Sequence, residues 1–312
     1  MTTAADSPGI YKALVLGATG ALGSRVATEL LRRGVQVRAL RRWRSGVEAL
    51  GERADAIDWA VGDLRDREAL RWAVSGCDVV FHVAGHSPTW GEPRRELMEH
   101  GLVGMRNVLA ILREVTLSRL VYVSSALTLV PGGDGLEPRL PGVIGDDLMQ
   151  LKYFMELEAL KYAALGYPVV VVNPALCLGG GGARRPGGQA LVKAWSEGRV
   201  RLVKGGELAV IDVEDAARGV VEAALSGRVG ERNLVAGHVV TARGLAERLG
   251  RGGATVSVPE AAWWAWARRR LPREVALLCG HGFAPPRQEE AWALLGGEVR
   301  PLEETLRVCV GG

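Results

Sequence analysis

The chain has 312 residues, of which 48% are hydrophobic and 24% are charged, and its formal net charge is +4. This composition suffices for one large globular domain or a domain with a smaller appendage. The basic residues are dispersed apart from clusters at 41–44 and 268–270, so nucleic-acid binding has little support.

No stretch reaches the ~18 uninterrupted apolar residues of a membrane span, and the first residues lack the pattern of a signal peptide. We therefore expect a cytoplasmic protein that does not enter a membrane. The four cysteines lie far apart without a C-x-x-C pair, and no histidines cluster, so we expect free thiols and no metal site.

Residues 12–42 have the pattern of a strand, a glycine turn, an amphipathic helix and a second strand. Gly17 permits a sharp turn, Gly20 leaves room for a pyrophosphate, and Gly23 lets the helix pack closely on the strand. The helix N-terminus adds free N–H groups that favour an anion. This pattern predicts a dinucleotide site, which we extend to Thr19, Ala21 and Leu22; a tight turn without a ligand is the alternative.

Two arginines, Arg41 and Arg42, follow the second strand, where an NAD enzyme would place an acidic residue on the ribose 2′-hydroxyl. A guanidinium there would bind a 2′-phosphate, and a carboxylate would repel it. The sequence therefore favours NADP over NAD. The alternative is a solvated basic loop.

Strand and helix patterns continue to alternate up to residue 174, which predicts an α/β fold with a doubly wound, Rossmann-like parallel sheet of about seven strands. Residues 1–178 would form the dinucleotide-binding domain, to which 205–235 would return. Glycine-rich residues 179–188 end the alternation, and we assign 179–312 mainly to a small substrate-binding region. The elements expected after the first unit are strands at 56–61, 78–85, 120–125 and 167–174, helices at 66–75 and 146–164, a helix ending near 113, and a loop at 130–145.

The carboxyl edge of such a sheet is where ligands bind. Ser124 and Ser125 follow the fifth strand at this edge, and Asp63 follows the third, where it would bind an adenine amino group. A solvated turn aspartate is the alternative for Asp63. Further cofactor contacts are expected from Leu64, Val83, Ala84, Gly85 and Pro174.

The order of these motifs resembles the extended short-chain dehydrogenase/reductase family, within it the NAD(P)-dependent epimerase/dehydratases that are similar to dihydroflavonol 4-reductases and hopanoid-associated sugar epimerases. The resemblance implies a small carbonyl or hydroxyl substrate, such as a sugar nucleotide or a flavonoid-like ketone. It also implies a homodimer that pairs helices near 93–113 and 146–164. The matching segments are 17–23, 37–42, 62–64, 81–85 with Trp90, 121–125, 168–174 and 212–215.

The resemblance assigns Ser125 to polarising the substrate oxygen and Lys152 to holding the nicotinamide ribose. The family's tyrosine, four residues before the lysine, is replaced by Leu148, which cannot transfer a proton. His86 is a substitute candidate, with Tyr153 and Thr128 behind it; a solvated loop histidine is the alternative for His86. A second departure is Gly101, where relatives commonly carry asparagine.

Two functions follow from these residues. The first is an NADP-dependent oxidoreductase or epimerase with an atypical active site. The second is a catalytically inactive NADP-binding sensor or regulatory protein of the same fold. The helix at 259–270 combines three tryptophans with arginines, as interfacial membrane helices do, but we favour packing over a substrate pocket.

Overall fold

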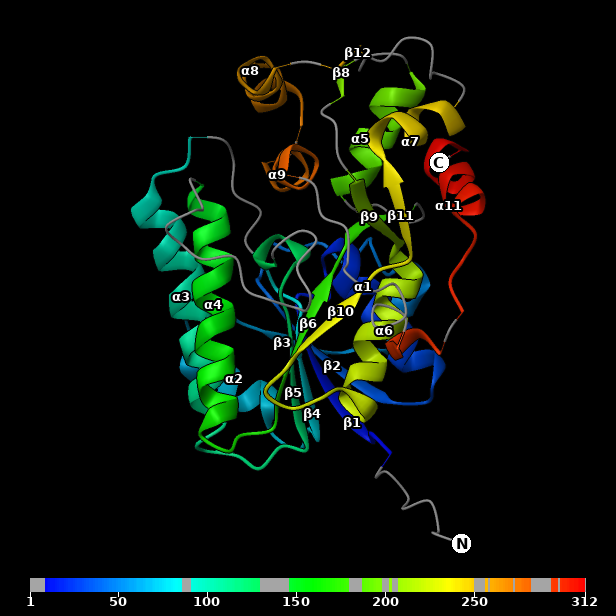
Figure 1. Ribbon diagram of the computed structural model, residues 1–312. Helices are drawn as coiled ribbons and strands as arrows, with labels where there is room; N and C mark the ends of the chain where they lie inside the picture. Colours follow the sequence, from blue (N-terminus) through cyan, green and yellow to red (C-terminus); the bar gives the residue numbers. More distant parts are fainter. Residues whose placement is uncertain are drawn as a thin grey trace, which may run out of the picture.

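A parallel β-sheet with helices on both faces forms the centre of the molecule (Figure 1). The computed structural model describes residues 9–85, 91–129, 146–179, 187–197, 202–203, 207–249, 256–257, 259–271, 273–281, 293–296 and 298–311. The loop expected at 130–145 and the candidate His86 lie outside these residues.

Within the described residues, seven strands form this sheet in the order β10-β6-β5-β4-β1-β2-β3, and all neighbours run parallel. The chain builds outward from β1 to β3 and then returns to place β4 on the other side of β1. This reversal confirms the doubly wound fold and puts a ligand-binding crevice at the carboxyl ends of β1 and β4. The strands are β1 (Lys12–Leu16), β2 (Gln36–Arg41), β3 (Asp58–Val61), β4 (Val79–His82), β5 (Arg119–Val123), β6 (Val169–Pro174) and β10 (Arg232–Val235).

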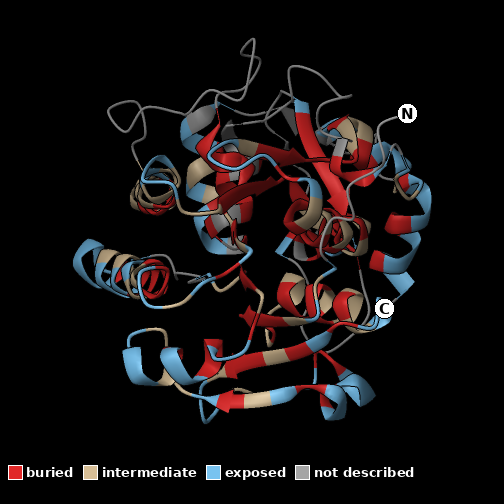
Figure 2. Ribbon diagram, turned by 90° about the horizontal axis from the view of Figure 1, so that it is seen from below, coloured by how far each residue is buried: buried red, intermediate tan, exposed pale blue. Residues whose placement is uncertain are grey.

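Alternating side chains on each strand enter two apolar clusters, one on each face of the sheet. On one face, Val15 and Phe81 pack against α1 (Ala21–Arg32) and α6 (Val213–Ser226). On the opposite face, Leu16 and Val80 pack against three helices. Figure 2 shows the strands buried between the helices. The three helices on the second face are α2 (Arg67–Val74), α3 (Arg94–Ile111) and α4 (Asp147–Ala164).

The smaller region lies beyond the carboxyl edge of the main sheet (Figure 1). Its strands form a sheet in the order β11-β9-β7 and a two-stranded pair, β12-β8. Its elements are β7 (Leu176–Leu178), α5 (Gly187–Ser196), β8 (Leu202–Val203), β9 (Glu207–Asp212), β11 (His238–Thr241), α7 (Ala242–Arg248), β12 (Val256–Ser257), α8 (Glu260–Arg270), α9 (Arg273–His281) and α11 (Leu302–Gly311). Short 3-10 helices are η1 (Gly51–Ala56), η2 (Ala126–Thr128) and η5 (Ala293–Leu295).

The described part of residues 205–235, which the sequence assigned to the first domain, divides between the two sheets. β10 pairs with β6, and α6 packs against α1. β9 instead pairs with β7 and β11, because β7 starts just after β6 ends and offers β9 a parallel neighbour outside the main sheet.

Helix α8 packs against α9, and its Trp263 side chain is 1% exposed. Trp264 and Trp266 pack partly on the same apolar cluster, while Arg268 and Arg269 are exposed. None of the helices in the described ranges is both long and apolar enough to cross a membrane. The tryptophans therefore serve the core of the smaller region.

Candidate functional site

A cleft of about 920 Å³ opens at the carboxyl edge of the main sheet. One side is formed by the ends of β1 to β4 and the other by β7, α5 and α9. Every residue that the sequence assigned to the cofactor lines this cleft: Gly17, Thr19, Gly20, Ala21, Leu22, Gly23, Arg41, Arg42, Asp63, Leu64, Val83, Ala84, Gly85, Lys152 and Pro174.

The glycine turn that begins the cleft has no room for a side chain at Gly17 or at Gly23. Gly17 has a φ of +97°, and a Cβ atom on Gly23 would lie 2.1 Å from the Gly17 carbonyl oxygen. Gly20 caps α1 without a side-chain hydrogen bond. The first N–H groups of α1 are therefore open to a ligand, and together with the helix dipole they fit the pyrophosphate of a dinucleotide.

Positive charge gathers beside this turn. Arg41 donates from Nη1 to the Ser45 carbonyl at 3.1 Å and lies over the Trp59 ring, while its Nε is buried without a partner in the described chain. Asp63 accepts from Arg65 Nε at 2.8 Å, and this contact lowers the pKa of the Asp63 carboxyl. Among the described residues that line the cleft, the carboxylate here is thus already paired, and the arginines beside it could hold an anionic group of a cofactor.

Ser125 and Lys152 line the same cleft. The Ser125 side chain is 3% exposed, and its Oγ accepts from the Leu127 amide at 3.3 Å, which starts η2. Leu148 lies one turn before Lys152 on α4, but its side chain is 1% exposed within the apolar cluster and outside the cleft lining. The structure thus brings the serine and the lysine together and leaves the tyrosine position in the core.

Thr128 and Tyr153, the candidates to replace the missing tyrosine as proton donor, do not line the cleft either. Thr128 is fully buried, and Tyr153 packs against the apolar cluster beside Phe154. Thr128 instead donates to Glu156 at 2.7 Å, and Tyr153 is not among the described residues that line the cleft. His86 lies outside the described residues.

Beneath the serines, the fully buried Glu156 of α4 accepts hydrogen bonds from the end of β5, from η2, from β6 and from β10. Its Oε2 accepts from Ser124 Oγ at 2.6 Å, from Thr128 Oγ1 at 2.7 Å and from Asn173 Nδ2 at 2.7 Å. Its Oε1 accepts from Arg232 Nε at 2.6 Å. The network fixes the ends of β5 and β6, and so fixes the backbone that carries Ser125.

His82 also lines the cleft, which the sequence did not predict because this residue lies in an apolar strand. The side chain is 1% exposed, neither ring nitrogen has a hydrogen-bond partner in the described chain, and burial lowers the pKa of His82 to about 4. Its ring lies 5.5 Å from the Tyr122 ring on β5. His82 is therefore a neutral imidazole at pH 7 below the cleft.

Arg273 was also missed, because no local motif surrounds it. It is the first residue of α9, its side chain is 8% exposed, and it lines the cleft. Its Nη2 and Nε donate to Asp146 Oδ2 at 3.0 and 3.2 Å. Only the fold brings this residue to the start of α4.

Gly101 lies in the cleft lining on α3, where the end of the Leu151 side chain takes the space of a Cβ atom. An added Cβ would lie 2.7 Å from both Leu151 methyl carbons. Packing of Leu151 against position 101 therefore explains why this chain has glycine there and not asparagine.

Comparison with known proteins agrees with this geometry. Residues 13–237 match the NAD dependent epimerase/dehydratase family. The chain belongs to this family. It is 33% identical over 246 residues to a Synechocystis sp. protein named for dihydroflavonol 4-reductase, covering 75% of this chain and 70% of that protein.

Two other relatives widen the chemical range of the family. Sterol demethylase protein B of Methylococcus capsulatus is 33% identical, over 73% of this chain and 70% of that protein. A nucleoside-diphosphate-sugar epimerase from Pseudomonas aeruginosa superposes with a TM-score of 0.77 and 25% identity, covering 96% of each chain. These findings confirm the resemblance to extended short-chain dehydrogenase/reductases and place this protein among NAD(P)-dependent epimerases and reductases.

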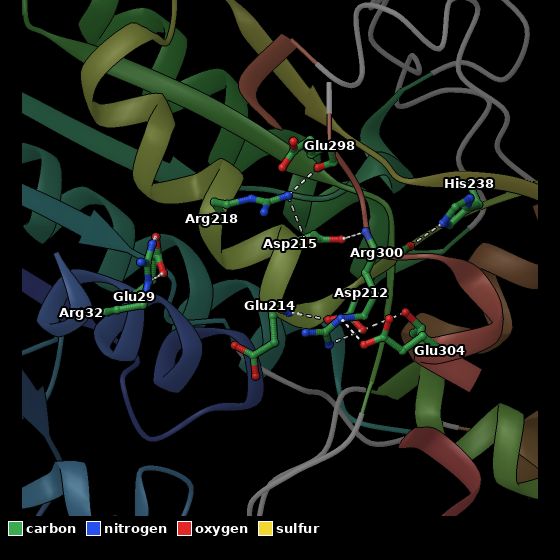
Figure 3. Close-up of polar contacts among 11 residues, drawn as sticks. Glu29, Arg32, Asp212, Glu214, Asp215, Arg218, His238, Glu298, Arg300 and Glu304 are labelled. Atoms are coloured by element: carbon green, nitrogen blue, oxygen red, sulfur yellow. Dashed lines mark hydrogen bonds and ion pairs between the residues drawn. The ribbon is translucent and has the colours of Figure 1, made fainter. Parts of the chain in front are cut away.

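In this epimerase/dehydratase family member, a second charged network ties the C-terminal segment to α6 (Figure 3). Asp212 Oδ2 accepts from Arg300 Nη1 at 3.1 Å and from Thr305 Oγ1 at 2.8 Å, and Asp215 Oδ2 accepts from the Arg300 amide at 2.7 Å. His238 Nε2 lies 2.8 Å from the Arg300 carbonyl. The network holds the start of α6, where Val213 lines the cleft.

Across the described ranges, no group of three or more potential metal ligands occurs.

Proposed function

We propose that this protein is an NADP-dependent oxidoreductase or epimerase for a small carbonyl or hydroxyl compound, with an active site that lacks the usual tyrosine. The observation that supports this most strongly is one cleft lined by the glycine turn, Arg41, Ser125 and Lys152. The relatives are named for a flavonoid, a sterol and a nucleotide sugar. Their names favour a hydroxylated ring compound or a related ketone as substrate.

In this proposal the α1 N-terminus binds the pyrophosphate, Arg41 and Arg42 bind the 2′-phosphate, and Lys152 binds the nicotinamide ribose. The bound nicotinamide supplies or accepts the hydride. Ser125 donates a hydrogen bond to the reacting oxygen. Since Leu148 has no proton to transfer, and a positioned acid typically contributes about 10²–10⁴ in rate, we expect turnover to be slow.

Cofactor preference is tested by titrating NADPH and NADH into the wild type and into Arg41→Ala, Arg42→Ala and Arg44→Ala. Arg44 is an exposed neighbour outside the cleft lining, so its variant is the matched control. A charge-assisted contact to phosphate is worth about 1.5–3 kcal/mol, or roughly a 10- to 150-fold difference in affinity. NADPH should bind tighter, and Arg41→Ala or Arg42→Ala should remove that preference. Equal wild-type affinities would refute the NADP assignment.

Turnover is tested by following NADPH oxidation with ketone substrates in the wild type and in Leu148→Tyr. The larger ring has to enter a buried site, at a cost of about 1–3 kcal/mol in folding free energy, so thermal unfolding is measured alongside. Measurable wild-type oxidation supports the enzyme. A silent wild type with a gain of activity in the variant supports an inactive cofactor-binding protein.

The inactive NADP-binding sensor or regulatory protein is the second candidate function. It is favoured by the positions of Leu148, Thr128 and Tyr153, none of which lines the cleft. We also propose a division into residues 1–178, to which 205–235 return, and 179–312, which form mainly the substrate-binding region. We further propose a cytoplasmic location and a homodimer through α3 and α4. Val103 and Leu157 on these helices are 39% and 47% exposed, which supports such a contact.

A further inference from the structure

Two polar residues of the cleft lining have hydrogen-bonding capacity that the described chain does not use. His82 is the last residue of β4, Ser124 follows β5 directly, and both line the cleft. They are almost buried, with His82 1% and Ser124 7% exposed. The proposed function gives neither of them a role.

His82 and Ser124 lie on the same face of the main sheet. His82 pairs with Tyr122 on the neighbouring strand, and Ser124 comes two residues after Tyr122. The Ser124 amide donates to the Val172 carbonyl at 2.7 Å, so the strand geometry continues to this residue. The spacing of strands and of residues within them puts the two Cα atoms about 8 Å apart. Side chains at this separation can contact the same small group.

The Ser124 hydroxyl is available to a ligand only as an acceptor. Its O–H donates to Glu156 Oε2 at 2.6 Å, and the Glu156 carboxylate is held as an acceptor by its pair with Arg232. No group of the described chain donates to Ser124 Oγ. A serine oxygen has two lone pairs, so it can still accept a hydrogen bond from a ligand.

His82 supplies the complementary donor. Neither of its ring nitrogens has a partner in the described chain. Burial lowers the pKa of His82 to about 4, so at pH 7 the neutral ring carries one N–H donor and one acceptor nitrogen. Buried polar groups in folded proteins are nearly always hydrogen-bonded, because leaving one unpaired destabilises the fold. An oxygen from a ligand would pair the N–H.

One hydroxyl group matches both residues at once. Its oxygen can accept from the His82 N–H while its hydrogen points to Ser124 Oγ. A carbonyl or ether oxygen has no hydrogen for Ser124. An ammonium group is disfavoured, because Asp63 is the only carboxylate of the described lining and is paired with Arg65.

We propose that His82 and Ser124 together bind a hydroxyl group of the substrate, other than the reacting oxygen that Ser125 contacts. The inference rests on the proposed function for the identity of the cleft. It narrows the substrate class to compounds with a hydroxyl group near the reacting carbon, namely hydroxy ketones and the diols formed from them.

The test compares ketones that differ by one hydroxyl group, bound to the NADP⁺-saturated protein, in which no hydride is available. 3-Hydroxyflavanone is compared with flavanone by calorimetry, and 2-hydroxycyclohexanone with 2-methoxycyclohexanone by NMR titration. Two hydrogen bonds between neutral groups should make a hydroxy ketone bind about 5-fold or more tightly than its partner. If neither hydroxy ketone shows this preference, absence of binding included, the proposal is overturned.

Three variants separate recognition from structure. His82→Phe and Ser124→Ala should each reduce the preference to about twofold or less, while binding of the ketones without a hydroxyl changes by less than about twofold. Thr128→Val is the matched control, because Thr128 donates to the same Glu156 oxygen at 2.7 Å but does not line the cleft. It should keep the preference. Equal losses in Thr128→Val and Ser124→Ala would show a structural role only and would overturn the proposal.

The ring-nitrogen resonances of His82, in wild-type protein labelled with ¹⁵N-histidine, give a readout that does not depend on the folding of a variant. Saturation with 2-hydroxycyclohexanone should shift them more than saturation with 2-methoxycyclohexanone does. A shift caused by NADP⁺ alone, unchanged by the hydroxy ketone, would assign the site to a ribose hydroxyl of the cofactor and would overturn the proposal, as would equal shifts with both ketones.

The outcome for this site is independent of turnover. A hydroxyl preference without NADPH oxidation would support the site formed by His82 and Ser124 while refuting the enzyme. Oxidation of NADPH without a hydroxyl preference would do the reverse.

Discussion

The two walls of the cleft are built in different ways. The cofactor wall, formed by lining residues 17–85, is made by backbone over short sequence distances: the Gly20 amide donates to the Gly17 carbonyl at 2.9 Å. The opposite wall, which the proposed function gives to the substrate, is formed by lining residues 175–177, 187–188, 213 and 273–275 and depends on side-chain contacts between distant segments. Arg273 and Asp146 are 127 residues apart, and Thr305 and Asp212 are 93 apart. Local backbone can thus shape one wall of the cleft, whereas the other wall depends on polar side-chain contacts between distant segments.

The largest effect is expected where the backbone of the cofactor wall is closest. Gly23→Ala places a Cβ atom 2.1 Å from the Gly17 carbonyl oxygen, so α1 or β1 must move. Overpacking of this kind costs about 3 kcal/mol or more in folding free energy and should abolish NADPH binding. Gly20→Ala is the matched control for folding, because its Cβ would lie 3.2 Å from the same oxygen. Denaturant unfolding compares the two variants, and equal losses of folding free energy would refute the steric account.

The next effect concerns the charge network below the serines. Glu156→Gln leaves Arg232 without its carboxylate, and removing one partner of a buried pair costs about 3 kcal/mol. Glu158→Gln, on the same helix, breaks a surface pair with Arg106 and should cost less than about 1 kcal/mol. Denaturant midpoints of the two variants give the comparison. Similar losses would mean that burial does not control the strength of the network.

These two sites also show what the sequence was able to predict. The glycine turn and the strand-end residues lie within short motifs, so their positions in the cleft followed from strand and helix periodicity. The Glu156 network joins residues up to 76 positions apart, and no periodicity encodes such a contact. Arg273 was missed for the same reason. His82 was missed because burial conceals a polar residue in an apolar strand.

A pH effect of intermediate size is expected at the boundary between the walls, where His82 lies below the cleft. Its folded-state pKa is about 4, below the value of about 6.5 expected in the unfolded chain. Below pH 6.5 the unfolded state binds a proton that the native state refuses, so stability falls as the pH is lowered towards 4. The loss approaches about 1.4 kcal/mol per pH unit.

Between pH 7 and pH 5 the wild type should therefore lose about 2 kcal/mol more than His82→Leu, measured by urea unfolding at each pH. His100→Gln is the control for removing a histidine from a more exposed position, because the His100 side chain is 44% exposed. If the free energy of unfolding depends on pH in the same way in His82→Leu and in the wild type, His82 binds its proton in the folded protein as readily as in the unfolded chain.

The smallest effect is expected where α3 and α4 meet beside Lys152. The helix propensity of alanine in Gly101→Ala should stabilise the folded state by up to about 1 kcal/mol. The clash with the Leu151 methyl groups should destabilise it by about 1–2 kcal/mol, so the net effect is a small destabilisation. In a Leu151→Ala background the clash is absent, so the same substitution should stabilise the protein. Gly104→Ala is the control, since its nearest contact is Leu64 at 3.2 Å, and its effect should be the same in both backgrounds. A double-mutant cycle from unfolding free energies measures the coupling. Coupling near zero would mean that Leu151 does not exclude a side chain at 101, and that this stretch of the lining is set by backbone, as the cofactor wall is.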